Sequence, residues 1–147
     1  AKGCITDRIA EFLKSKGLRE FAIDSRGDVL VSGEYSHVLG IQHPREKNKN
    51  IFSIKIKNQS VATSGDYNQF HGSFEKSHII NGSDVISTTV VAENLEEADV
   101  YATALFVANE KERINLIKNN KKIHVLIIKK DLSCKMYNDF EELTNGK

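Results

Sequence analysis

Cysteine is scarce in this sequence, and the two that occur, Cys4 and Cys134, lie near opposite ends of the chain. Their separation fits neither the spacing of a metal site nor a disulfide framework, so we expect two unpaired thiols. Long apolar runs are also absent, and no segment reaches the length that a membrane-spanning helix needs. No repeat, low-complexity tract or interior linker divides the 147 residues. These absences indicate one domain with one core.

An excess of charge of one sign is missing too, because 21 Lys and Arg residues balance 20 Asp and Glu residues. Lysine-rich stretches occur at residues 45–49 and 118–122, but Asn and Glu interrupt them and no aromatic residue is interleaved for base stacking. We therefore expect solvated loops and helix ends at these positions. The charge balance favours neither nucleic acid nor a membrane surface as a partner.

Hydrophobic periodicity predicts a series of consecutive strands with helices before and after it. In the first helix, Ile9, Ala10, Phe12 and Leu13 give an amphipathic pattern, and a polar tail follows the last strand. This order favours an α+β fold with a mainly antiparallel sheet and helices on one face. The expected elements are a helix at 7–16, strands at 19–24, 29–32, 37–42, 51–56, 60–63, 73–80 and 85–92, helices at 97–107 and 110–119, and a strand at 123–128.

The segment at residues 97–107 predicts a helix that is apolar on nearly every side, which is typical of a buried helix. It nevertheless carries a carboxylate and a hydroxyl on one face, because Asp99 and Thr103 are four residues apart. A buried carboxylate needs a neutralising partner, and a bound cation would serve. The structural alternative is that Thr103 bonds back to the carbonyl of Asp99 while Asp99 caps a neighbouring element. The helix alone leaves both interpretations open.

Six short motifs follow one another in an order that resembles the ApbE family of flavin transferases over residues 2–128. The Thr-Ser-Gly-Asp-Tyr and Ala-Asp-x-x-Ala-Thr-Ala segments are the most specific. The motifs are Ala1-Lys2-Gly3-x-x-x-Asp7, Asp24-x-x-Gly27-Asp28, Gly40-Ile41-x-His43-Pro44, Val61-Ala62-Thr63-Ser64-Gly65-Asp66-Tyr67, His78-Ile79-Ile80 and Ala98-Asp99-x-x-Ala102-Thr103-Ala104-Leu105.

The resemblance implies a fold and an activity. The fold would be an ApbE-like core related to the tunnelling folds. The activity would be that of a transferase that takes FMN from FAD, attaches it through a phosphoester to a Thr or Ser hydroxyl of a target protein, and releases AMP. FAD is then the substrate, and an acceptor flavoprotein is the expected partner.

The same resemblance implies roles for four residues. Asp99 and Thr103 would coordinate Mg²⁺, and oxygen ligands suit that hard ion. Lys2 matches a residue that contacts FAD, whereas without the resemblance it would be taken as an ordinary surface lysine. Ile80 matches a position that lines the flavin nucleotide, a role that is compatible with a place in the core of a strand.

His78 matches the active-site histidine of the family and is the candidate acid/base residue. The attacking hydroxyl must lose its proton as it reacts with phosphorus, and a neutral imidazole can accept a proton near pH 7. The alternative is a strand histidine that bonds the backbone. We expect His43 to lie in a loop, and His37 and His124 to be structural.

Two acids and one turn have less specific roles. Asp7 and Asp28 match family acids, and we expect each to cap or brace the turn that follows it. The turn at Ser64-Gly65-Asp66 either faces a phosphate or simply connects two strands. Ser64 lacks a visible base partner, so we do not assign it as a nucleophile.

The sequence departs from the family pattern in two respects. Family members follow the His-Ile-Ile segment with Asp-Pro-x-x-Gly, whereas this chain has Asn81-Gly82-Ser83-Asp84, a shorter loop that puts closure over the substrate in question. The chain also resembles the C-terminal half of a full-length member and starts without Met. We therefore expect residues 1–147 to form an ApbE-like domain that lacks the N-terminal half, with a further Mg²⁺ ligand, a backbone carbonyl, just before Lys2.

Three hypotheses follow. The chain is a piece of a longer Mg²⁺-dependent FAD:protein FMN transferase, or a short homologue that completes its pocket with a second subunit, or a non-catalytic flavin-binding or assembly module. The first is our leading hypothesis. The compartment stays open, because this chain alone predicts a cytoplasmic protein whereas family members are often exported lipoproteins.

Overall fold

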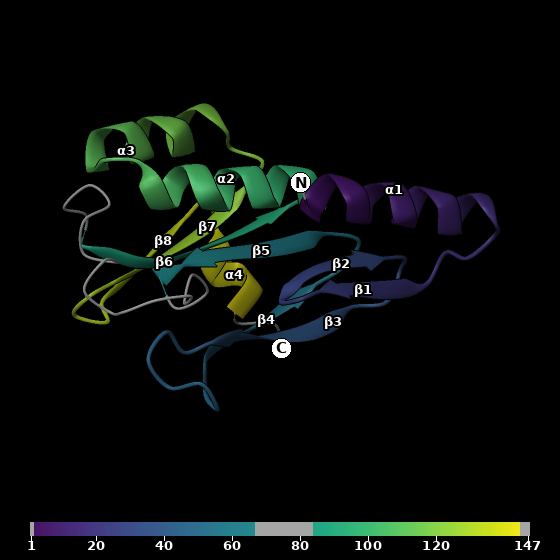
Figure 1. The fold of residues 1–147 in the computed structure, drawn as a ribbon, viewed down its shortest axis with the longest axis horizontal. Helices are drawn as coiled ribbons and strands as arrows, with labels where there is room; N and C mark the ends of the chain where they lie inside the picture. The colour runs from purple at the N-terminus through teal and green to yellow at the C-terminus, as the bar shows by residue number, and fades with distance from the viewer. Residues whose placement is uncertain (1, 67–83, 145–147) are drawn as a thin grey trace.

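The computed structural model describes residues 2–66 and 84–144, drawn as coloured ribbon in Figure 1. A run of consecutive strands has helices before and after it, as the sequence predicts. The elements are α1 (Lys2–Ser15), β1 (Phe21–Ser25), β2 (Asp28–Ser32), β3 (His37–Gln42), β4 (Asn50–Ile56), β5 (Ser60–Gly65), β6 (Val85–Ala92), α2 (Leu95–Val107), α3 (Glu110–Asn119), β7 (His124–Lys129), β8 (Cys134–Tyr137) and α4 (Phe140–Thr144).

A six-stranded sheet in the order β1-β2-β5-β6-β7-β8 forms the centre of the molecule, and every neighbouring pair in it is antiparallel. Strands β3 and β4 form a separate antiparallel pair. The α+β class with a mainly antiparallel sheet is therefore confirmed. Among the helices of the described residues, none has the length and apolar character that a membrane crossing requires.

The two faces of the large sheet are covered differently (Figure 1). Helix α2 packs along β5 and β6, and α1 and α3 adjoin it on the same side. The opposite face meets the β3–β4 pair and the short helix α4, whose Phe140 is fully buried. Successive side chains of a central strand point to opposite faces of the sheet. Val90 therefore packs toward the helices, and Val91 packs toward the β3–β4 pair.

Helix α1 packs against α2 through small side chains instead of its apolar ones. Gly3, Thr6 and Ala10 are its buried residues, whereas Ile9 and Phe12 of the predicted apolar face are exposed. The reason is the close approach of the two helices, since a Cβ atom on Gly3 would lie 2.5 Å from the Leu95 carbonyl oxygen. Large side chains do not fit in such a contact.

Some helices and strands begin, end or occur at positions that differ from those predicted from the sequence. Helix α1 already includes Lys2, before the predicted start at Asp7. The predicted polar tail contains β8, which pairs with β7, and α4. Both are too short for periodicity to reveal, and pairing and packing stabilise them instead. The predicted strand at 73–80 lies outside the described residues.

Helix α2 is buried along one stripe, not all round. Leu95, Ala98, Ala102 and Leu105 face the sheet, whereas Val100 on the opposite side is 59% exposed. The sequence suggested a fully buried helix because its apolar content is high, but the side that carries Val100 is not covered in the described part of the chain.

Candidate functional site

A cavity of about 610 Å³ opens where β2 and β5 separate. The register joins these strands at Val29↔Val61 and Leu30↔Ser60, and beyond that point β5 continues beside β6 alone. The opening gives access to both faces of the sheet, so the cavity has two unlike walls. The polar wall comprises Lys2, Arg26, Asp28, Thr63, Ser64, Asp99 and Thr103, and the apolar wall comprises Val29, Leu39, Ile41, Ile54 and Val61.

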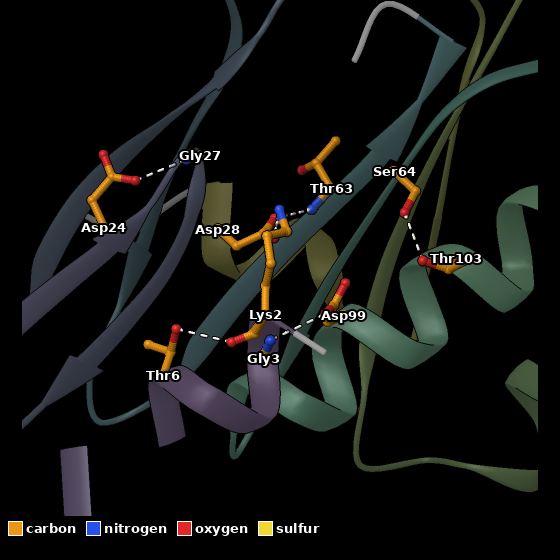
Figure 2. Close-up of polar contacts among 10 residues, drawn as sticks. All are labelled: Lys2, Gly3, Thr6, Asp24, Gly27, Asp28, Thr63, Ser64, Asp99 and Thr103. Carbon is orange, nitrogen blue, oxygen red and sulfur yellow. Dashed lines mark hydrogen bonds and ion pairs between the residues drawn. The ribbon is translucent and has the colours of Figure 1, made fainter. Parts of the chain in front are cut away.

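Two residues of the polar wall, Lys2 and Asp28, form an ion pair (Figure 2). The ammonium nitrogen of Lys2 lies 2.6 Å from Oδ2 of Asp28, which is almost fully buried. The backbone N–H of Thr63 donates to Oδ1 of the same carboxylate at 3.2 Å. Asp28 thus binds a β5 amide at the point where β5 has left β2, and the lysine neutralises its buried charge.

The Asp99 carboxylate and the Thr103 hydroxyl lie one turn apart on α2, as predicted, and both line the cavity. Gly3 N–H donates to Oδ2 of Asp99 at 3.1 Å, so Asp99 does bind a neighbouring helix, as the structural interpretation expected. The Thr103 hydroxyl lies 3.1 Å from the Ser64 hydroxyl at the end of β5. Figure 2 shows the Gly3–Asp99 bond next to Lys2 and the Ser64–Thr103 contact farther along α2.

Helix α2 is anchored at both ends, which fixes the positions of Asp99 and Thr103. At its start, Asn94 accepts from Glu97 N–H, and Asp7 of α1 accepts from the N–H groups of Leu95 and Glu96 at 2.9 and 2.7 Å. Asp7 therefore caps, as expected of it, but the helix it caps lies far along the chain.

The C-terminal end of α2 is held by a buried arginine from α3. Nε of Arg113 donates to the Leu105 carbonyl at 2.8 Å, and a terminal guanidinium nitrogen donates to the Ala108 carbonyl at 2.6 Å. Burial lowers the pKa of the Arg113 guanidinium below its ordinary value, partly offset by Asp84 and Glu110. The cation at this helix end also matches the sign of the helix dipole.

The charges that line the cavity cancel one another. Lys2 and Arg26 supply two cations, and Asp28 and Asp99 supply two carboxylates. Among the described residues, no three His, Cys, Asp or Glu side chains gather as a metal cluster. The carboxylate and hydroxyl oxygens of Asp99, Thr103 and Ser64 nevertheless fit a hard cation that keeps several waters and needs few protein ligands.

Two of the predicted site residues, His78 and Ile80, lie outside the described residues, so their roles stay predictions. The other histidines behave as expected where contacts are present. His43 accepts from the N–H groups of Arg45 and Glu46 in the loop after β3. His124 binds the Asn138 carbonyl at 2.6 Å. Both cysteines are free thiols.

One polar link was not anticipated from the sequence. Arg45, in the loop between β3 and β4, binds Asp66 through two parallel bonds of 3.0 and 2.9 Å. This fork ties the pair of strands that carries much of the apolar wall to the end of β5. The only sequence signal was the presence of Asp66 in a recognisable motif, because nothing local identifies a partner 21 residues away.

Comparisons with known proteins agree on one family. A sequence model of the ApbE family matches residues 1–127. An FAD:protein FMN transferase of Buchnera aphidicola subsp. Schizaphis graminum is 30% identical in an alignment of 144 positions that covers 88% of this chain and 42% of that protein. Another from Vibrio cholerae is 27% identical, over 93% of this chain and 45% of its own.

Solved structures give the same answer. The ApbE protein of Thermotoga maritima superposes with a TM-score of 0.80 at 25% identity, over 98% of this chain and 51% of that one. Flavin transferase ApbE from Vibrio cholerae gives 0.77 at 26% identity, over 97% and 50%. The chain spans between 41% and 45% of the length of the curated relatives it matches.

Proposed function

Because the chain belongs to the ApbE family, we propose that it takes part in transferring FMN from FAD to a protein hydroxyl, the activity for which its relatives are named. The acceptor would be a Thr or Ser of a target flavoprotein, and AMP would be released. Our prediction that a preceding segment or a second subunit completes the pocket belongs to this proposal.

The observation that carries the proposal is the pairing of two unlike walls in one cavity. A flavin nucleotide has a flat apolar ring and a charged diphosphate. The apolar wall offers branched aliphatic side chains such as Ile41 and Ile54, which suit a ring. The polar wall offers the Lys2 ammonium and the hydroxyls of Ser64 and Thr103, which suit phosphate oxygens.

The charge balance supports a requirement for a divalent cation. The cavity-lining side chains of the described residues sum to zero charge, so they do not neutralise a diphosphate by themselves. Asp99 and Thr103 would hold Mg²⁺ with the aid of waters and of ligands outside the described residues. Bound Mg²⁺ would polarise a phosphoryl oxygen and neutralise charge on the leaving phosphate.

The remaining steps are assigned to side chains. Lys2, oriented by Asp28 at 2.6 Å, would bind a phosphate oxygen of FAD. The acceptor hydroxyl would attack the phosphorus of the FMN portion while His78 takes its proton. The bond from that phosphorus to the bridging oxygen breaks, a new P–O bond joins FMN to the protein, and AMP leaves with the bridging oxygen.

The test is to incubate the chain, together with the preceding segment or second subunit that completes its pocket, with FAD and Mg²⁺, with and without an acceptor peptide, and to measure AMP. We expect AMP to be released in step with peptide-bound flavin, and EDTA to stop both. Absence of AMP when the chain has that segment or subunit and is given FAD, Mg²⁺ and acceptor would contradict the transferase proposal.

The second candidate is a flavin-binding or assembly module without turnover. It is favoured by the protein partners that Lys2 and Asp99 already have, since Asp28 engages the first and Gly3 N–H engages the second. The same experiment separates the two candidates, because this module would bind FAD and quench its fluorescence without releasing AMP.

A further inference from the structure

The turn that joins β1 to β2 holds an unusual residue. Ser25 pairs with Asp28, so the turn consists of Arg26 and Gly27, and both have positive φ values of 58° and 98°. Such two-residue turns favour Asn or Gly at the first position, because Gly has no Cβ and the short polar side chain of Asn tolerates positive φ, whereas other side chains are strained there. Arg26 therefore occupies a position that local backbone preference would give to a smaller residue.

Arg26 also lies at the cavity. It lines the cavity together with Gly27 and Asp28, and its side chain is exposed to solvent. Across residues 2–66 and 84–144, the structure gives its guanidinium neither a hydrogen bond nor an ion pair. The other cation of the cavity differs in this respect, since Lys2 is paired with Asp28.

We propose that Arg26 is a further binding residue of the site and that it contacts a phosphate of the nucleotide substrate. The inference deepens the proposed function and rests on it. A guanidinium presents several donors in a plane and matches phosphate oxygens in a fork, which an ammonium cannot do. The positive charge of Lys2 is partly neutralised by the Asp28 carboxylate. The guanidinium of Arg26 is therefore the cation that is available to a bound phosphate.

The strained backbone makes it possible to separate an effect on binding from an effect on folding. Replacing Arg26 by a residue that prefers positive φ should stabilise the fold, so a weaker affinity of that variant does not come from a damaged fold. Residues strained at functional sites show an opposition between stability and activity. Asn is the suitable replacement, because it tolerates the left-handed conformation and lacks the charge.

The experiment compares Arg26→Asn with wild type by titrating ADP in the presence of Mg²⁺ and by measuring the melting temperature. We expect the Kd for ADP to rise about 10-fold, as for loss of one charged hydrogen bond, and the melting temperature to rise by about 1–3 °C. Arg19→Asn is the matched control, because Arg19 is exposed and does not line the cavity. Its Kd should equal that of wild type.

The outcomes separate this inference from the proposed function. Wild type that binds ADP while Arg26→Asn binds it equally well would overturn the role of Arg26 alone. A Kd raised equally in Arg26→Asn and Arg19→Asn would also overturn it, because general charge would then explain the effect. Wild type that binds neither ADP nor FAD would overturn both proposals together.

Discussion

The two walls of the cavity are built on different principles. The polar wall is assembled by contacts between segments far apart in the chain, such as Gly3 with Asp99, which are 96 residues apart, and Ser64 with Thr103, which are 39 apart. Much of the apolar wall comes from the β3–β4 pair, where neighbouring strands fix Leu39 opposite Ile54. Local pairing positions one wall, and docking of helices positions the other.

Because of this difference, substitutions in the two walls should affect different properties of the protein. Side chains of the apolar wall are part of a core cluster, so their loss should reduce stability directly. Groups of the polar wall contribute fewer buried contacts, and their loss should change geometry and chemistry more than stability. Substitutions in each wall, paired with a control, test this division.

The largest effect is expected at Asp99. Replacing Asp99 with Ala should lower Mg²⁺-dependent AMP release on the order of 1,000-fold, because a carboxylate that holds the cation is removed. Asp99→Asn is the informative partner, since its amide oxygen can still accept from Gly3 N–H. We expect it to be nearly as inactive. Activity retained in Asp99→Asn but lost in Asp99→Ala would instead assign Asp99 a structural role.

The next effect concerns the apolar wall. Ile54 is 1% exposed, and Ile54→Ala should reduce the free energy of unfolding by about 2–4 kcal/mol through lost burial and a new cavity. Val38, on the partner strand β3, is 70% exposed, so Val38→Ala should cost less than about 0.5 kcal/mol. Urea unfolding of both variants measures the difference, and equal losses would contradict the assignment of Ile54 to the core.

A smaller loss is expected when the docking of the polar wall is disturbed. Gly3→Ala places a Cβ atom 2.5 Å from the backbone oxygen of Leu95, so α1 must move away from α2, at about 1–3 kcal/mol of stability. Gly40→Ala is the control, because its new Cβ meets the side chain of Asn50, which can turn aside. Urea unfolding should show the larger loss for Gly3→Ala. Equal losses would contradict the docking argument.

The smallest effect provides a baseline outside both walls. Lys129 lies 2.6 Å from Asp84, and its hydrogen bond lowers the pKa of that carboxyl. A lowered folded-state pKa contributes stability above the unfolded pKa, and this is lost as the pH falls through the folded value. Asp84→Asn should therefore lower the melting temperature at pH 7 by less than about 2 °C, since Asp84 is 56% exposed.

The difference between this variant and wild type should shrink as the pH falls through the folded-state pKa of Asp84, because the carboxyl then becomes neutral. Thermal melts across this pH range measure the effect. A difference between the two proteins that grows as the pH falls would contradict the assigned direction of the pKa shift.

Much of the fold could be predicted from the sequence, because alternation and apolar runs report directly on strands and helices. Strand β4, with its clean alternation, and helix α3, whose start is marked by Asn109 and Glu112, are examples. The packing of α1 could not be predicted, since Ala10 of its predicted apolar face is buried whereas Ile9 and Phe12 are exposed. Of the candidate site, the Asp99–Thr103 pair could be placed on one face in advance, but Arg26 carried no local signal.

The sequence by itself determined the class of fold, the family and the pairing of Asp99 with Thr103 on one helical turn. Each follows from residue types at short, fixed spacings, which local geometry converts into a shared face. The tertiary structure decided the rest: that Asp28 pairs with Lys2, that Gly3 brings α1 onto Asp99, and that β2 and β5 separate to open the cavity. These features depend on docking between distant segments, and short-range patterns carry no information about such distances.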